Sequence, residues 1–78
     1  MTRQGSRVAL GKAIRYLRLE RDQTQEALAH KAGVTVGHLS KIERGHANPT
    51  WETLEAIAAA LEVSISGLAK QAEKRLSA

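Results

Sequence analysis

The 78-residue sequence contains no cysteine, a single proline and only two aromatic residues, Tyr16 and Trp51. Without cysteine the chain forms neither a disulfide nor a thiolate metal site, which suits a reducing compartment. Its apolar runs are far shorter than the ~20 residues that a transmembrane helix needs. The basic N-terminus is not followed by the apolar segment of a secretion signal. We therefore expect a cytoplasmic protein that does not associate with membranes.

The motifs of common enzyme classes are also missing. The sequence has no cysteine nucleophile, no Gly-rich phosphate loop and no pair of carboxylates placed for acid–base catalysis. His30, His38 and His46 fall on two different predicted helices and a loop, which does not match the close spacing of metal ligands on one helix. We predict a protein that is not an enzyme and that needs no cofactor, metal ion or small-molecule ligand.

The charge is unevenly distributed along the chain, whose formal net charge is +4. Residues 1–50 carry nine Lys or Arg against four acidic residues, whereas residues 51–78 carry three against four. A basic surface attracts polyanions such as nucleic acids, because binding releases their counterions. The charge therefore favours a nucleic-acid partner for the first part of the chain.

Apolar residues recur at helical spacing in five segments, which predicts a compact all-α domain of five helices over residues 7–78. A domain of this size has a core that usually supplies only ~3–5 kcal/mol, close to the lower limit for independent folding. The predicted helices are residues 7–21 (or 6–21), 25–32, 36–44, one that follows the cap Thr50, and one that Ser64 opens. Residues 1–6 are expected to form a flexible basic arm.

Residues 24–44 have the layout of a helix-turn-helix. Thr24 is suited to cap a first short helix, and Gly33 to end it in the left-handed conformation. Thr35 is suited to cap a second one. Ala29 and Gly33 are four residues apart, and we expect both to lie where the two helices cross, so that a larger side chain at either would change the crossing angle.

The chain resembles the Cro- and lambda-repressor-like (XRE-type) family of DNA-binding domains over nearly its whole length. The matching segments are LGKAIRYLRLER (10–21), TQEALAHKAGV (24–34), HLSKIERG (38–45), NPTWETLEAIAAALEV (48–63) and SISGLA (64–69), in the family's order and spacing. The resemblance implies a five-helix fold that places its third helix in the major groove of double-stranded DNA. It also implies a regulator of transcription that acts as a homodimer.

The sequence departs from the family pattern where the first helix ends. Asp22 replaces the usual glycine, and Gln23 replaces the usual apolar residue. Asp tolerates the left-handed conformation better than most residues, so we expect the turn to be retained at some cost in stability. The polar side chain of Gln23 is expected to remove an apolar contact that fixes the start of the second helix.

The resemblance assigns roles to individual residues. Arg18 and Glu43 match an ion pair between the first and third helices that holds the recognition helix in place, and the alternative is two solvated surface charges. Gln25 matches a residue that binds a DNA phosphate, and the alternative is an exposed glutamine in a first turn. The full set of expected DNA contacts is Gln25, Thr35, Val36, Gly37, His38, Lys41, Arg44, His46 and Asn48.

The start of the third helix is expected to read the DNA bases. Val36 offers an apolar surface to a thymine methyl group, and Gly37 lets the backbone approach closely. His38 and Lys41 are able to donate hydrogen bonds to base edges or to phosphates. Few of these side chains make bidentate contacts, so we expect DNA shape to supply much of the discrimination. The alternative is that they form a solvated helix face.

The last two helices, within residues 50–76, are expected to supply the dimer contact, because they are rich in Ala and Leu. The candidate contact residues are Trp51, Leu54, Ile65, Leu68 and Leu76. The alternative is that the fifth helix only closes the core of the monomer. A dimer would set two recognition helices about 34 Å apart, one turn of B-DNA, and so predicts a pseudo-palindromic operator.

The sequence thus predicts a sequence-specific transcriptional regulator that binds double-stranded DNA as a homodimer. A phage-type repressor, a restriction–modification controller and an antitoxin are all compatible with it. The alternative is an antitoxin or adaptor that keeps the fold but works mainly through a protein partner, such as a toxin or RNA polymerase. The dependence of binding on salt across different DNA sequences distinguishes DNA from an acidic protein partner.

Overall fold

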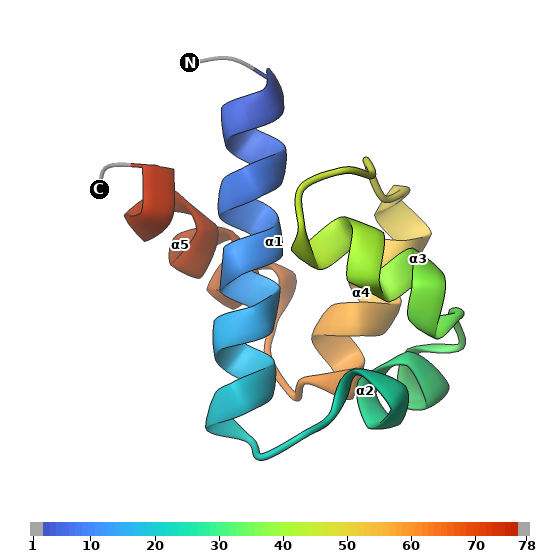
Figure 1. Ribbon diagram of the computed structural model, residues 1–78. Helices are drawn as coiled ribbons and strands as arrows, with labels where there is room; N and C mark the ends of the chain where they lie inside the picture. Colours follow the sequence, from blue (N-terminus) through green and yellow to red (C-terminus); the bar gives the residue numbers. More distant parts are fainter. Residues whose placement is uncertain (1–2, 77–78) are drawn as a thin grey trace.

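The computed structural model describes residues 3–76, with side chains from residue 5 onwards. Within that range it contains five helices and no strand, which confirms the predicted fold class. The helices are α1 (Arg3–Glu20), α2 (Gln25–Ala32), α3 (Val36–Glu43), α4 (Trp51–Ala60) and α5 (Ile65–Leu76). Figure 1 shows α1 in the middle, with α5 against one side of it and α2, α3 and α4 on the other. No helix of the described range is long and apolar enough to cross a membrane.

Each of helices α2 to α5 begins after a Ser or Thr side chain that accepts a hydrogen bond from the backbone amide three residues later. The caps, with the oxygen–nitrogen distances, are Thr24 (3.0 Å), Thr35 (3.0 Å), Thr50 (3.1 Å) and Ser64 (2.9 Å). Each bond satisfies an amide that the first helical turn leaves free, and such a cap typically contributes ~1 kcal/mol. The predicted starts of these helices are therefore confirmed.

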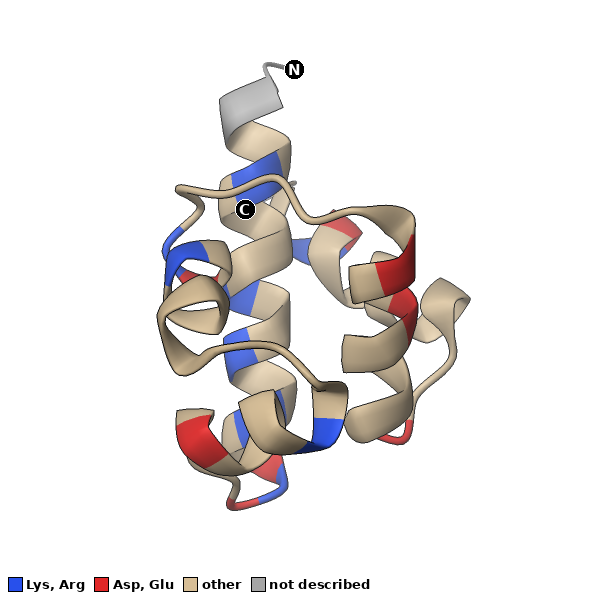
Figure 2. Ribbon diagram, turned by 90° about the vertical axis from the view of Figure 1, so that its right-hand side faces the viewer, with Lys and Arg blue, Asp and Glu red and all other residues tan. Residues whose placement is uncertain are grey.

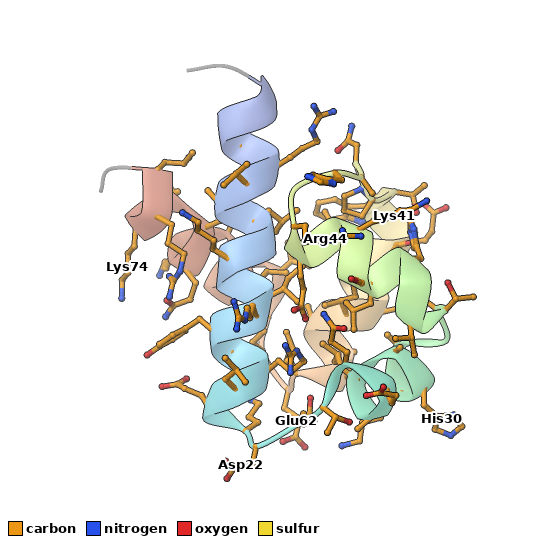
Figure 3. The ribbon with its side chains drawn as sticks, in the orientation of Figure 1. Asp22, His30, Lys41, Arg44, Glu62 and Lys74 are labelled. Atoms are coloured by element: carbon orange, nitrogen blue, oxygen red, sulfur yellow. The ribbon has the colours of Figure 1, made fainter. Side chains whose placement is uncertain are left out.

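Helices α1 to α4 are each followed by a residue in the left-handed conformation. The residues and their φ angles are Asp22 (53°), Gly33 (73°), Gly45 (76°) and Glu62 (60°). The predicted conformations of Asp22 and Gly33 are confirmed, whereas that of Glu62 was not anticipated. Figure 3 places Asp22 and Glu62 at the same end of the molecule, where α1 and α4 both end.

The start of α1 corrects the predicted N-terminal arm. The helix begins at Arg3, so residues 3–6 continue α1 instead of forming a separate segment. The physical reason is that nothing between Arg3 and Arg7 interrupts a helix, because the single Gly5 costs only ~1 kcal/mol relative to alanine. Residues 1–2 of the predicted arm lie outside the described residues.

The core lies between α1 and the other four helices. Its largest fully buried side chains are Ile14, Leu28, Leu39, Ile42, Ile57 and Leu61. Leu68 of α5 is also buried in this cluster, with 2% of its surface exposed. The prediction that Leu68 contacts a second protomer is therefore wrong, because α5 packs against α1 and covers that side chain. Leu54 and Ile65 are partly buried and pack against the same core.

Helices α1 and α3 are in backbone contact at Gly11. A Cβ atom at this residue would lie 2.4 Å from the carbonyl oxygen of Ile42 and 2.5 Å from that of Glu43. By contrast, a Cβ atom at Gly33 would meet nothing within 4 Å. The prediction that Gly33 leaves room for a helix crossing is wrong. The left-handed φ angle is what favours glycine there, and the crossing that needs a missing side chain is at Gly11.

One contact between α1 and α5 was not predicted from the sequence. The guanidinium carbon of Arg75 lies 4.5 Å from the centre of the Tyr16 ring. The Tyr16 hydroxyl donates a hydrogen bond to Glu20 at 2.9 Å. That hydrogen bond and the charge of Glu20 raise the pKa of the Tyr16 phenol above its ordinary value. The Arg75–Tyr16 contact thus joins the end of α5 to the exposed face of α1.

Candidate nucleic-acid interface

Helix α3 turns one face into the core and the other to solvent. Leu39 and Ile42 are at most 1% exposed, which confirms them as core residues. Val36, Gly37 and Lys41 are exposed on the other face. The helix therefore presents the start of its outer face to a partner, with Val36 38% exposed.

The other candidate DNA contacts in and beside α3 differ in their exposure and in their hydrogen bonds. Thr35 is exposed, and its hydroxyl oxygen accepts the hydrogen bond that caps the helix, so the residue has a structural role whatever it contacts. His38 is half-buried and not fully outward. Arg44 is exposed, and its Nε donates to the Ser40 carbonyl at 3.3 Å. Figure 3 shows Lys41 on α3 and Arg44 directly after its end, with Lys74 at the far side of the molecule.

The loop between α3 and α4 continues this surface. Its residues His46 and Asn48 are both exposed. The loop lies against the N-terminal half of α1, because a Cβ atom at Gly45 would be only 2.8 Å from Val8 Cγ2 and 3.0 Å from Val8 Cα. The exposed end of α3, the loop and α1 thus form adjoining parts of one surface.

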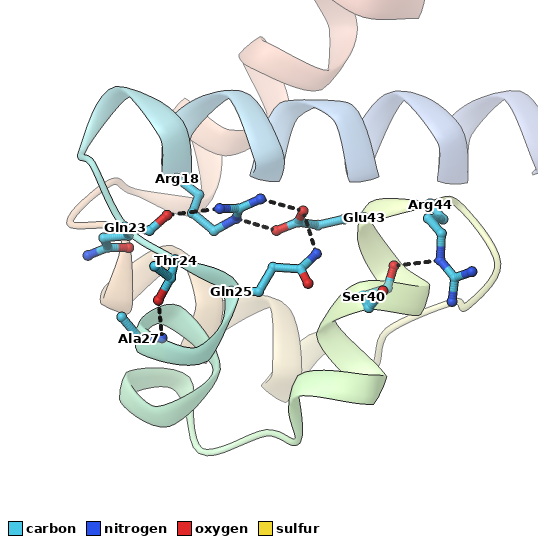
Figure 4. A network of polar contacts seen from close by, with 8 residues as sticks. All are labelled: Arg18, Gln23, Thr24, Gln25, Ala27, Ser40, Glu43 and Arg44. Carbon is cyan, nitrogen blue, oxygen red and sulfur yellow. Dashed lines mark hydrogen bonds and ion pairs between the residues drawn. The ribbon is translucent and has the colours of Figure 1, made fainter.

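A buried ion pair fixes α3 against α1. Arg18 Nε lies 2.7 Å from Glu43 Oε2, and Arg18 Nη2 lies 3.0 Å from Glu43 Oε1 (Figure 4). Both residues are 7% exposed, so the solvated alternative is excluded. The bidentate geometry gives Glu43 two charge-assisted hydrogen bonds and sets the angle between the two helices. Removing one partner of such a pair would leave the other charge buried without compensation.

Two glutamines complete this network, and the sequence did not indicate either contact. Gln25 is half-buried, and its Nε2 donates to Glu43 Oε1 at 3.0 Å. The backbone carbonyl oxygen of Gln23, not its side chain, accepts a hydrogen bond from Arg18 Nη1 at 2.8 Å (Figure 4). The network therefore joins α1, the following turn, α2 and α3. Gln25 still has a second amide hydrogen to offer a phosphate, while its first one supports the ion pair.

Charge is unevenly distributed among the helices. Residues 1–19 contain basic residues and no acidic one, whereas α4 contains Glu52 and Glu55 and no basic residue. In Figure 2 blue positions follow the long helix, and red positions lie at the right of the view, with further red positions at the lower left. A polyanion would be attracted to the side formed by α1 and α3. The described residues contain no group of three or more side chains suited to hold a metal ion.

Comparison with proteins of known sequence identifies relatives among transcription regulators. The immunity repressor protein of Bacillus phage phi105 is 41% identical over 61 residues, which cover 78% of this chain and 42% of the repressor. The transcriptional regulator ClgR of Mycobacterium tuberculosis is 34% identical over 71 residues, which cover 91% of this chain and 63% of ClgR. The chain thus spans about half of the length of these relatives.

Solved structures have the same arrangement of helices. The clp gene regulator ClgR from Corynebacterium glutamicum superposes with a TM-score of 0.90 at 32% identity, covering 92% of this chain and 77% of that one. The restriction–modification controller protein C.Esp1396I was solved as a tetramer in complex with its natural 35-base-pair operator. It superposes with a TM-score of 0.86 at 33% identity, covering 94% of this chain and 96% of that one.

A family model described as helix-turn-helix matches residues 14–68, which include α2, α3 and α4 in full. The predicted resemblance is confirmed by this match, by the relatives and by the fold. The chain belongs to the XRE-type, lambda-repressor-like family of helix-turn-helix DNA-binding proteins.

Proposed function

We propose that this protein is a sequence-specific transcriptional regulator that binds double-stranded DNA as a homodimer and inserts α3 into the major groove. The observation that carries the proposal is the outer face of α3, which is exposed at Val36, Gly37 and Lys41 and is fixed in place by the buried Arg18–Glu43 pair. An eight-residue helix is about 12 Å long, and the major groove is about 12 Å wide.

The chemistry of this face suits base and phosphate contacts. Val36 would pack on a thymine methyl group, and Lys41 would donate to a guanine or to a phosphate. Arg44, His46 and Asn48 are exposed beyond the end of the helix and would contact the DNA backbone. Because no Arg, Asn or Gln lies on the exposed first turn of α3, we expect modest base discrimination and a contribution from DNA shape.

The dimer contact is proposed on the side of α4 and α5. Trp51 is 58% exposed, the largest exposed fraction of any big apolar side chain in the described range. Leu76 is half-buried at the end of α5. A second protomer covering these side chains would remove apolar surface from water, which favours association. Two-fold symmetry would then place one recognition helix in each of two successive major grooves.

Binding-site selection from a random duplex library tests the proposal. The recovered duplexes would be titrated with the protein at low and near-physiological salt. We expect a pseudo-palindrome with half-sites about one helical turn apart, whose binding persists at the higher salt. Recovery of no consensus, with binding that disappears as salt rises, would contradict the proposal and would favour a protein partner instead.

A further inference from the structure

Arg7 lies on the face of α1 that is turned towards α3. Residues of an α-helix are about 100° apart, so residues 7, 11 and 18 lie within about 40° of one another around the axis. Gly11 touches the last turn of α3, and Arg18 pairs with Glu43 of the same helix. Arg7 is one turn further along α1, and so lies beyond the end of α3.

The neighbouring contact places Arg7 beside the loop between α3 and α4. Val8 packs directly on Gly45, the second residue of that loop. Arg7 therefore adjoins the segment that contains Arg44 and His46, both exposed and both expected to contact the DNA backbone. These three residues come from two separate parts of the chain, and the family match at residues 14–68 does not include Arg7.

The guanidinium group of Arg7 has donor capacity that the described residues do not use. Its Nε is buried without a hydrogen-bond partner. The chain has no acidic residue before Glu20, and the only one on α3 or in the loop after it is Glu43, whose carboxylate is held by Arg18. The buried Nε thus lacks the acceptor that a buried donor normally has, and Arg7 as a whole is only half-buried.

We propose that Arg7 binds a phosphate group of the DNA backbone and thereby extends the DNA contact from the helix-turn-helix onto α1. The inference rests on the function proposed above. A phosphate oxygen supplies an acceptor of the right charge, and the planar guanidinium fork of arginine matches phosphate geometry. Such a contact positions the protein on the duplex and carries no base preference of its own.

The test is the salt dependence of DNA binding by the full chain. Binding would be measured by fluorescence anisotropy, on a selected duplex and on one of unrelated sequence. For Arg7→Gln we expect the plot of log K against log salt concentration to be shallower by about 1.8 per bound dimer, which is about 0.9 for the phosphate contact of each protomer. The change should be equal on both duplexes. Arg7→Lys, which keeps the charge, should retain most of the slope of the original protein.

Two controls separate this inference from a general effect of charge and from loss of the fold. Lys74→Gln removes one positive charge on the far side of the molecule (Figure 3) and should leave the slope unchanged. Arg7→Met, which keeps the apolar stem, repeats the test if thermal melting shows that Arg7→Gln unfolds. An unchanged slope for Arg7→Gln and Arg7→Met, or an equal reduction by Lys74→Gln, would overturn the inference and leave the proposed function intact. Failure of the original protein to bind DNA would overturn both.

Discussion

The backbone of Gly11 in α1 contacts the carbonyl oxygen of Ile42 in α3 so closely that a methyl group at Gly11 would lie 2.4 Å from it. This contact and the Arg18–Glu43 pair, two turns further along α1, together determine how α3 is presented. The position of the candidate DNA-reading helix therefore depends on α1, although the helix-turn-helix itself is formed by α2 and α3.

We predict that Gly11→Ala destabilises the domain in spite of alanine's higher helix propensity. The propensity gain is ~1 kcal/mol, but the new methyl group meets backbone atoms that move only with the whole helix. We expect a net loss of about 2 kcal/mol in the free energy of unfolding, measured by urea denaturation. Gly37→Ala is the matched control: it has nothing within 4 Å, so it should stabilise the domain. Equal stability of the two variants would contradict the close contact.

We predict that Arg18→Ala leaves the chain largely unfolded at room temperature. Glu43 would remain buried without its partner, at a cost of ~3–5 kcal/mol, which is comparable to the whole stability expected of such a domain. The double variant Arg18→Met with Glu43→Leu removes both charges and should recover much of the loss. Circular dichroism during heating measures both effects. If Arg18→Ala melts at the same temperature as the original protein, the ion pair contributes little to the stability of the fold.

Glu62→Gly is predicted to stabilise the protein. Glu62 holds a φ of 60°, which costs a residue with a side chain ~1–2 kcal/mol, and glycine avoids this cost. Glycine has more conformational entropy in the unfolded chain, however, and this offsets part of the effect. We therefore expect the free energy of unfolding to rise by only about 0.5–1 kcal/mol. The reverse change, Gly33→Ala, should destabilise through its φ of 73° alone, because the space around it is open. Thermal melting of both variants checks the prediction, and a loss of stability in Glu62→Gly would refute it.

If the dimer surface is as proposed, alanine substitutions at Trp51 and at Leu68 should have different effects on self-association and on stability. Trp51→Ala should weaken self-association, seen by analytical ultracentrifugation, while the monomer stays folded. Leu68→Ala removes a core side chain and should instead lower the free energy of unfolding by ~2–5 kcal/mol. If Trp51→Ala associates as strongly as the original chain, the dimer contact lies elsewhere.

The elements that sequence analysis predicted well have local causes. Thr24, Thr35 and Thr50 each cap a helix through an atom only three residues away, so the starts of those helices follow from short segments of sequence. The same holds for the left-handed turns at Asp22 and Gly33. These features need no knowledge of the tertiary structure, and they place the exposed face of α3 to within a residue.

The features that were missed depend on which helices meet. The close contact at Gly11 requires α3 to cross α1 at that residue, and a glycine inside a helix indicates a close approach without saying to what. The inward hydrogen bond of Gln25 exists because Glu43 lies opposite it. Leu68 was assigned to a dimer surface because apolar spacing on α5 does not say whether α1 or a second protomer covers that face.

The central claim is that α3 reads the DNA sequence, and a change of specificity tests it most directly. Binding-site selection would be carried out with the original protein and with Val36→Asn, because an asparagine side chain pairs with adenine through two hydrogen bonds. Lys70→Gln on α5 would serve as a control remote from α3. The account predicts that Val36→Asn alters the preferred base at one position in each half-site, while Lys70→Gln selects the original consensus. If Val36→Asn recovers the same consensus as the original protein, α3 does not read DNA at that position, and the account is contradicted.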